Sequence, residues 1–165
     1  MGCRETKKVM KNHYKLIIAV VVSLMAGVLG SVFTSEAIPT WYATLEKPDF
    51  TPPNWVFAPV WTTLYILMGV AAYLVWREGF HKTEVKIALT LYAIQLTLNV
   101  LWSMIFFGLR NPLYGLFDIS ALIILLILTT KQFREINKNA ALLLMPYLLW
   151  VLYASLLNFN IWLLN

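Results

Sequence analysis

Charge is scarce in this sequence. Lys, Arg, Asp and Glu make up 13% of its 165 residues, and 60% of the residues are hydrophobic; the mean hydropathy is +0.70. A soluble domain carries roughly 25% charged residues because its surface faces water. Most of this surface therefore faces lipid, which predicts an integral membrane protein.

Cysteine and histidine are nearly absent. Cys3 is the single cysteine, which excludes an intrachain disulfide framework. The two histidines, His13 and His81, fall in basic segments, which excludes a bis-histidine haem site buried among helices. The sequence also lacks a Cys/His cluster with metal-ligand spacing, a phosphate-binding glycine loop and a plausible Ser/His/Asp arrangement. We therefore expect no metal site, no required cofactor and no conventional enzyme.

Five long apolar runs are present. A hydrocarbon core about 30 Å thick needs roughly 20 apolar residues as a helix. The runs are continuously apolar, which favours helices over the alternating strands of a barrel, and no cleavage site follows the first, so we expect it to be retained. The sequence predicts an all-α bundle of five transmembrane helices over residues 16–165, after a basic tail at 1–15; the spans are 16–33, 57–76, 85–107, 113–130 and 140–164.

The positive charges predict the orientation. All but two of the 13 Lys and Arg residues lie in the tail and in the second and fourth connections; the exceptions are Lys47 and Arg110. The positive-inside rule then places the N-terminus in the cytoplasm and the C-terminus outside. The membrane is the plasma membrane if the host is prokaryotic, and a mitochondrial outer membrane stays open. Since the net charge of +5 is distributed between spans, we expect no nucleic-acid partner.

The first connection, residues 36–56, is long and unusual in composition. Long loops in compact domains are usually functional lids or disordered linkers. This one is too aromatic for a solvated linker, which predicts an ordered lid over the outer mouth of the bundle. The residues concerned are Pro39, Trp41, Tyr42, Pro48, Phe50, Pro52, Pro53 and Trp55.

Polar side chains inside the spans are few. Asp118 is the one acidic residue well within a span, and an intramembrane carboxylate is by default functional, in proton coupling or ligand contact. The alternative is an aspartate hydrogen-bonded to a neighbouring helix or reaching interfacial water. Gln95, Asn99 and Ser103 recur every fourth residue and share one helix face. They are either interhelical hydrogen-bonding groups or the polar wall of a ligand site.

Aromatic residues follow helical spacing in two spans. Trp61 and Tyr65 share a stripe on the second span, and Tyr147, Trp150 and Ala154 share one on the fifth. Trp61 and Trp150 lie deeper than the interfacial belt where tryptophan usually anchors. Several indole faces and one amide suit a flat apolar ligand with polar edges.

The chain also begins with a weak lipidation pattern. Gly2 fits the N-myristoylation pattern and Cys3 is an adjacent palmitoylation candidate. A lipid anchor would add little to five spans, and whether Gly2 or Cys3 is lipidated stays open.

These residues resemble the TspO/translocator-protein family, which includes tryptophan-rich sensory proteins and the peripheral-type benzodiazepine receptor. The resemblance covers nearly the whole chain after the tail. Its motif runs from the lid through the second, third, fourth and fifth spans. The matching residues are Trp41, Tyr42, Leu45, Lys47, Pro48, Phe50, Thr51, Pro52, Pro53, Trp55, Pro59, Trp61, Leu64, Tyr65, Met68, Gly69, Gln95, Asn99, Trp102, Ser103, Phe106, Phe107, Gly108, Asp118, Pro146, Tyr147, Trp150, Ala154, Leu157 and Asn158.

The resemblance implies a lidded pocket for tetrapyrroles such as protoporphyrin IX, binding of benzodiazepine-type ligands, and often a homodimer. The pocket positions that it implies are Trp41, Pro48, Trp61, Tyr65, Asn99, Trp150 and Ala154. Residues 158–165 contain no Lys or Arg, so the basic cholesterol-recognition segment of the mitochondrial members is absent.

Three functions remain open at this point. We favour a membrane receptor or sensor that binds tetrapyrroles during porphyrin handling or stress. In some bacterial members the tryptophans matching Trp61 and Trp150 are associated with light- and oxygen-dependent porphyrin breakdown, which makes a degrading enzyme the first alternative. A proton-coupled carrier using Asp118 is the second.

Overall fold

The computed structural model describes the backbone of residues 2–165 and the side chains of residues 13–165. Five of its helices are long and apolar enough to cross a membrane, which confirms the predicted five-helix bundle of an integral, multi-pass membrane protein. The elements are α1 (Gly2–Ala37), α2 (Trp41–Thr44), α3 (Asn54–Trp76), α4 (Thr83–Ser103), the π-helical segment η1 (Met104–Gly108), α5 (Pro112–Ile136) and α6 (Lys138–Leu164).

The helices are longer than the apolar runs that predicted them. The membrane-spanning part of α1 covers His13–Ala37, and α5 continues to Ile136, beyond the predicted end at residue 130. Hydropathy marks the length in contact with lipid, whereas a helix continues into the headgroup region until a cap ends it. The lipidation candidates Gly2 and Cys3, and the basic side chains before residue 13, lie outside the described side chains.

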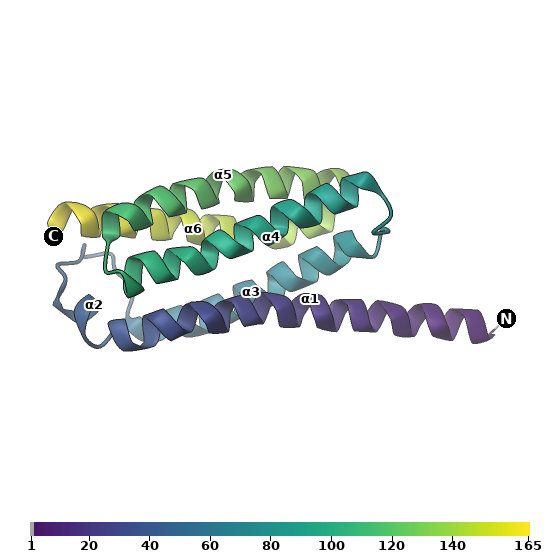
Figure 1. Cartoon of the computed structure of the whole chain (residues 1–165), viewed down its shortest axis with the longest axis horizontal. Helices are drawn as coiled ribbons and strands as arrows, with labels where there is room; N and C mark the ends of the chain where they lie inside the picture. Colours follow the sequence, from purple (N-terminus) through teal and green to yellow (C-terminus); the bar gives the residue numbers. More distant parts are fainter. Residues whose placement is uncertain (1) are drawn as a thin grey trace.

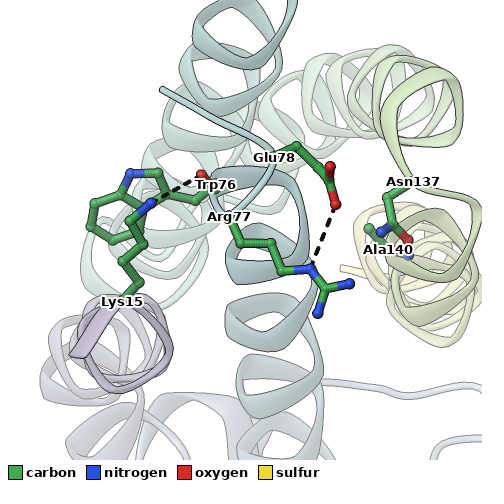
Figure 2. Close-up of polar contacts among 6 residues, drawn as sticks. All are labelled: Lys15, Trp76, Arg77, Glu78, Asn137 and Ala140. Carbon is green, nitrogen blue, oxygen red and sulfur yellow. Dashed lines mark hydrogen bonds and ion pairs between the residues drawn. The ribbon is translucent and has the colours of Figure 1, made fainter. Parts of the chain in front are cut away.

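Asparagine caps fix two of the helix starts. The Asn111 side-chain oxygen accepts a hydrogen bond from the Tyr114 backbone N–H at 3.0 Å, with Pro112 at the first helical position. Asn137 caps α6 in the same way, accepting from the Ala140 N–H at 3.1 Å (Figure 2). The asparagine in each short connection therefore fixes where the following helix, α5 or α6, begins.

The five long helices close into a ring. α1 packs against α3, α3 against α6, α6 against α5, α5 against α4, and α4 returns to α1; Figure 1 shows the chain reversing direction at each connection. The backbones of α1 and α3 approach closely at Gly69 of α3, where an added Cβ would lie 2.6 Å from the Val20 Cα of α1. A glycine at this point lets the two backbones pack directly in lipid.

Figure 2 shows how α1 is tied to α3 at one end of the bundle, which we call the basic end. The Lys15 ammonium donates to the Trp76 carbonyl at 3.4 Å and lies 5.5 Å from the centroid of its indole ring. The last carbonyls of a helix lack intrahelical donors and carry the negative end of the dipole, so a lysine stabilises this terminus. The neighbouring Arg77–Glu78 pair, at 3.6 Å and exposed, contributes little.

Residues 38–53, which we call the lid, cover the other end of the bundle, the lid end. Tyr42 is buried against Phe106 and Phe107, and the Lys47 ammonium lies 4.8 Å from the centroid of the Tyr42 ring. Burial, with the nearby Tyr153 phenol, raises the pKa of Tyr42 above its usual value. Its hydroxyl therefore stays neutral at physiological pH. The connection is ordered, as its aromatic content predicts.

Tyr153 of α6 and Asn165, the residue after α6, hold the lid. Glu46 donates its backbone N–H to the Asn165 side-chain oxygen at 3.0 Å, and the Asn165 amide returns a bond to the Glu46 carbonyl at 3.0 Å. The Tyr153 hydroxyl donates to the Phe50 carbonyl at 2.7 Å. These three bonds join the lid to the helix farthest from it in sequence.

Candidate functional site

A cavity of about 540 Å³ lies beneath the lid. Its walls come from α1, α3, the end of α4, η1 and α6. Aromatic rings supply much of the lining: Tyr42, Phe57, Trp61, Tyr65, Trp102, Phe106, Phe107 and Trp150. The cavity is therefore a largely apolar space within the membrane-spanning ring.

Four of the eight predicted ligand-binding residues line this cavity. Trp61 and Tyr65 reach it from α3, and Trp150 and Ala154 from α6. The Trp61 indole stacks on the Tyr65 ring, with centroids 5.6 Å apart and planes 29° apart. Trp150 meets Phe57 edge-on at 6.1 Å. The two helical stripes therefore converge on one space, with their rings held by neighbouring rings.

Asn99 and Tyr147 lie behind the wall and do not line the cavity. The Asn99 side-chain oxygen accepts a hydrogen bond from the Tyr65 hydroxyl, and its amide donates to the Tyr147 hydroxyl at 3.1 Å. Tyr147 is fully buried and Asn99 is 3% exposed. Asn99 thus links α3, α4 and α6 and fixes the Tyr65 ring that does face the cavity.

The lid residue that lines the cavity is not one of the two that were expected to line it. Trp41 packs edge-on against Phe106, 5.6 Å between centroids, and Pro48 forms a turn whose carbonyl accepts from the Thr51 N–H at 2.9 Å. Neither lines the cavity; Tyr42 does. Whether Trp41 and Pro48 contact a ligand stays a prediction.

Asp118 also lies outside the cavity lining. One oxygen of its carboxylate is buried without a hydrogen-bond partner among the described residues, and so are both polar atoms of the Gln95 amide. Ser103, the third member of the polar stripe on α4, does line the cavity, beside Gly30 of α1.

Sequence reasoning from periodicity missed the wall formed where α4 ends. The i to i+5 hydrogen bond from the Leu109 N–H to the Met104 carbonyl, 2.8 Å, marks a π-helical turn, a feature frequent at functional sites. Phe106 within it stacks on Trp102 at 5.1 Å and 20°, and both line the cavity. The one available signal was their presence in the family motif.

Asn158 braces this wall from α6. It accepts a hydrogen bond from the Trp102 indole N–H at 3.0 Å and donates to the Pro112 carbonyl at 2.7 Å. With 1% exposure, it joins α4, the start of α5 and α6. The bond from Trp102 orients its ring and occupies its indole N–H, so this donor is not free for a ligand.

The described side chains that line the cavity are mainly aromatic and aliphatic, and no His, Lys, Arg, Asp or Glu is among them. Among the described residues, no group of three or more His, Cys, Asp and Glu side chains could hold a metal ion. The aromatic faces offer large, rigid contact area to a flat apolar molecule. Phenol, hydroxyl and amide groups at Tyr42, Ser103 and Asn54 supply a few polar contacts.

The chain matches the model of the TspO/MBR family over residues 19–163. It is 51% identical to the Tryptophan-rich protein TspO of Archaeoglobus fulgidus over 154 residues, which are 93% of this chain and 99% of that protein. It is 42% identical to the Translocator protein of Homo sapiens over 136 residues, 81% of this chain and 80% of that protein. With the Tryptophan-rich sensory protein of Cereibacter sphaeroides it shares 38% identity over 126 residues, 76% of this chain and 77% of that protein. The chain therefore belongs to the TspO/MBR family.

Proposed function

We propose that this member of the TspO/MBR family is a membrane receptor or sensor that binds a tetrapyrrole such as protoporphyrin IX beneath its lid. One observation carries the proposal: an aromatic cavity of about 540 Å³ inside the helix ring, within the 300–1,000 Å³ typical of ligand sites. The names of relatives, Translocator protein and Tryptophan-rich sensory protein, fit such a role. Benzodiazepine-type ligands would use the same apolar walls.

Binding requires only the shape and the aromatic surface of the site. Trp61, stacked on Tyr65, offers a fixed aromatic face, and Trp150 offers another from the neighbouring helix α6. A macrocycle with polar edges would bury its rings between these walls. We further propose a cytoplasmic N-terminus, on the positive-inside rule, and a homodimer.

Ala154 gives the sharpest test because it lines the cavity and is small. In Ala154→Phe a phenyl ring would fill space that the ligand needs. We expect its dissociation constant for protoporphyrin IX, measured in the dark by tryptophan quenching with an inner-filter correction, to rise about tenfold, or about 1.4 kcal/mol. The matched control is Ala93→Phe, an exposed position on α4 outside the cavity, which should bind like the wild type.

Saturable quenching that weakens only in Ala154→Phe would support the proposal. Linear, unsaturable quenching that is the same in all three proteins would mean partitioning into detergent, and the receptor function would be wrong.

A porphyrin-degrading activity is the second candidate because Trp61 and Trp150 line the same cavity. An excited porphyrin generates reactive oxygen, which can oxidise an adjacent electron-rich indole. Under light and oxygen, product formation that stops in Trp150→Phe while binding persists would favour this enzyme. The carrier alternative depends on Asp118, which lies outside the cavity; unchanged uptake by Asp118→Asn proteoliposomes would exclude it.

A further inference from the structure

The lining of the cavity is exposed where α1 and α3 form it. Most of its lining residues are buried or half-buried, including every one from α4, η1 and α6. The exposed lining residues come from α1 and α3: Val28, Ser31, Asn54, Ala58 and Thr62. We call Val28, Ser31, Ala58 and Thr62 the seam.

The seam lies at membrane depth. Ala58 and Thr62 are four and eight residues inside the start of α3, and Ser31 and Val28 six and nine residues before the end of α1. At 1.5 Å per residue these positions lie about 6–14 Å from the lid end of their helices. They also fall one to five residues inside the lid-side ends of the predicted apolar spans 16–33 and 57–76, which places them in the lid-side half of a hydrocarbon core about 30 Å thick. The opening therefore faces acyl chains rather than water.

No hydrogen bond joins α1 to α3 across the seam in the described part of the chain. The Ser31 hydroxyl donates to the Val28 carbonyl at 2.7 Å, and the Thr62 hydroxyl donates to the Ala58 carbonyl at 2.8 Å. Each hydroxyl is thus satisfied by a carbonyl of its own helix, as lipid requires. Neither hydroxyl bonds to the facing helix. Deeper in the bundle the gap ends where the Tyr65 ring meets Gly27, whose added Cβ would lie 2.6 Å from that ring.

The lid end contrasts with the seam. There the Glu46–Asn165 pair, the Tyr153–Phe50 bond and the packing of Tyr42 on the rings of η1 hold the lid to the bundle. A ligand arriving from water would have to break these contacts. One arriving from the bilayer meets the apolar side chains of Val28 and Ala58 and two hydroxyl groups that are bonded within their own helices.

We propose that the cavity exchanges its ligand laterally with the bilayer through the seam, so that the site selects flat amphiphiles already dissolved in the membrane. This inference rests on the proposed receptor function and names its ligand class: molecules with an apolar ring body that partitions among acyl chains, rather than water-borne polyanionic tetrapyrroles. The lid then acts as a fixed roof, and the α1–α3 gap as the gate.

Thr62 and Thr63 provide a matched pair for the test. Both are exposed, adjacent on α3 and bonded to their own helix, Thr63 to the Pro59 carbonyl at 2.9 Å, but only Thr62 lines the cavity. Proteoliposomes preloaded with protoporphyrin IX would be perturbed by a temperature jump, and the relaxation of tryptophan quenching followed. In Thr62→Phe we expect relaxation to slow about tenfold, or about 1.4 kcal/mol in the barrier. Thr63→Phe should relax like the wild type.

The dissociation rate separates a gate from a binding wall. Thr62 lines the cavity, so a phenyl ring there can also weaken the affinity. An obstructed path delays exit and slows dissociation, whereas a ring that only removed binding space would speed dissociation, so we expect slower dissociation in Thr62→Phe. Val28→Phe repeats the test from α1, with Val32→Phe, exposed and outside the cavity, as its control.

Two results would overturn the lateral route while leaving the receptor function intact. One is wild-type relaxation in both seam variants with faster relaxation in Asn165→Ala, which would place the path under the lid. The other is lost affinity in the seam variants without slower dissociation. An absence of saturable binding in the wild type would instead overturn the proposed function itself, and the lateral route with it.

Discussion

Asn99 and Gln95 show how differently two amides four residues apart on α4 are used. Asn99 bonds to phenols on two other helices, whereas neither amide atom of Gln95 has a partner among the described residues. The sequence placed both on one face but left open whether that face was interhelical or part of a ligand wall. The partners of each amide depend on which helices lie opposite, and a single sequence does not encode that directly.

We predict that Asn99→Leu lowers the thermal stability of the protein and that Gln95→Leu does not. The first change leaves the Tyr65 and Tyr147 hydroxyls without their shared partner. At about 0.6 kcal/mol per interhelical hydrogen bond in a membrane protein, the loss is about 1–2 kcal/mol. Thermal unfolding in detergent, followed by circular dichroism, measures both variants. Equal losses in the two would show that side-chain volume, not the hydrogen bonds, determines stability here.

At the scale of elements, the sequence predicted the helices well and the irregular segments partly. The apolar runs located all five spans because lipid imposes a length and a composition. The π-helical turn at Met104–Gly108 was not predicted, since it changes the backbone register without changing hydropathy. That turn carries Phe106 and Phe107 into the cavity wall. Two of the eight aromatic lining residues therefore depend on a feature that periodicity does not reveal.

The lid offers a prediction that depends on one side chain. The Glu46 backbone N–H is bonded to the Asn165 side chain, so we expect its hydrogen exchange to accelerate in Asn165→Ala. A net hydrogen bond of about 1 kcal/mol corresponds to about a fivefold faster exchange. Nuclear magnetic resonance of the protein in micelles measures the exchange rate of the Glu46 amide directly. Asn160→Ala is the control, because the Asn160 amide donates to the Leu156 carbonyl of its own helix; equal rates in both variants would contradict the lid contact.

At the scale of the whole molecule, the fold makes the two ends chemically different. At the basic end, Lys15 donates a hydrogen bond to the Trp76 carbonyl at the C-terminus of α3, and the connection after α3 exposes Arg77 and Lys82. The lid end is aromatic and closed by α6. Composition predicted this polarity because lipid, water and the membrane potential act on whole segments. The placement of individual pocket residues needed the packing, as Trp41 and Pro48 show by lying outside the cavity wall.

The asymmetry of Lys and Arg, with Lys47 and Arg110 alone in the first and third connections, leads to our last prediction: the lid faces away from the cytoplasm. In a Cys3→Ser background, Asp49→Cys in the lid and His81→Cys at the basic end are both exposed single-cysteine positions, and neither change removes a Lys or Arg. A membrane-impermeant maleimide added to intact cells should label Asp49→Cys and spare His81→Cys, and both should react after permeabilisation. The reverse pattern would place the basic end outside, against the positive-inside rule, and would make the cytoplasmic leaflet the one that the seam faces.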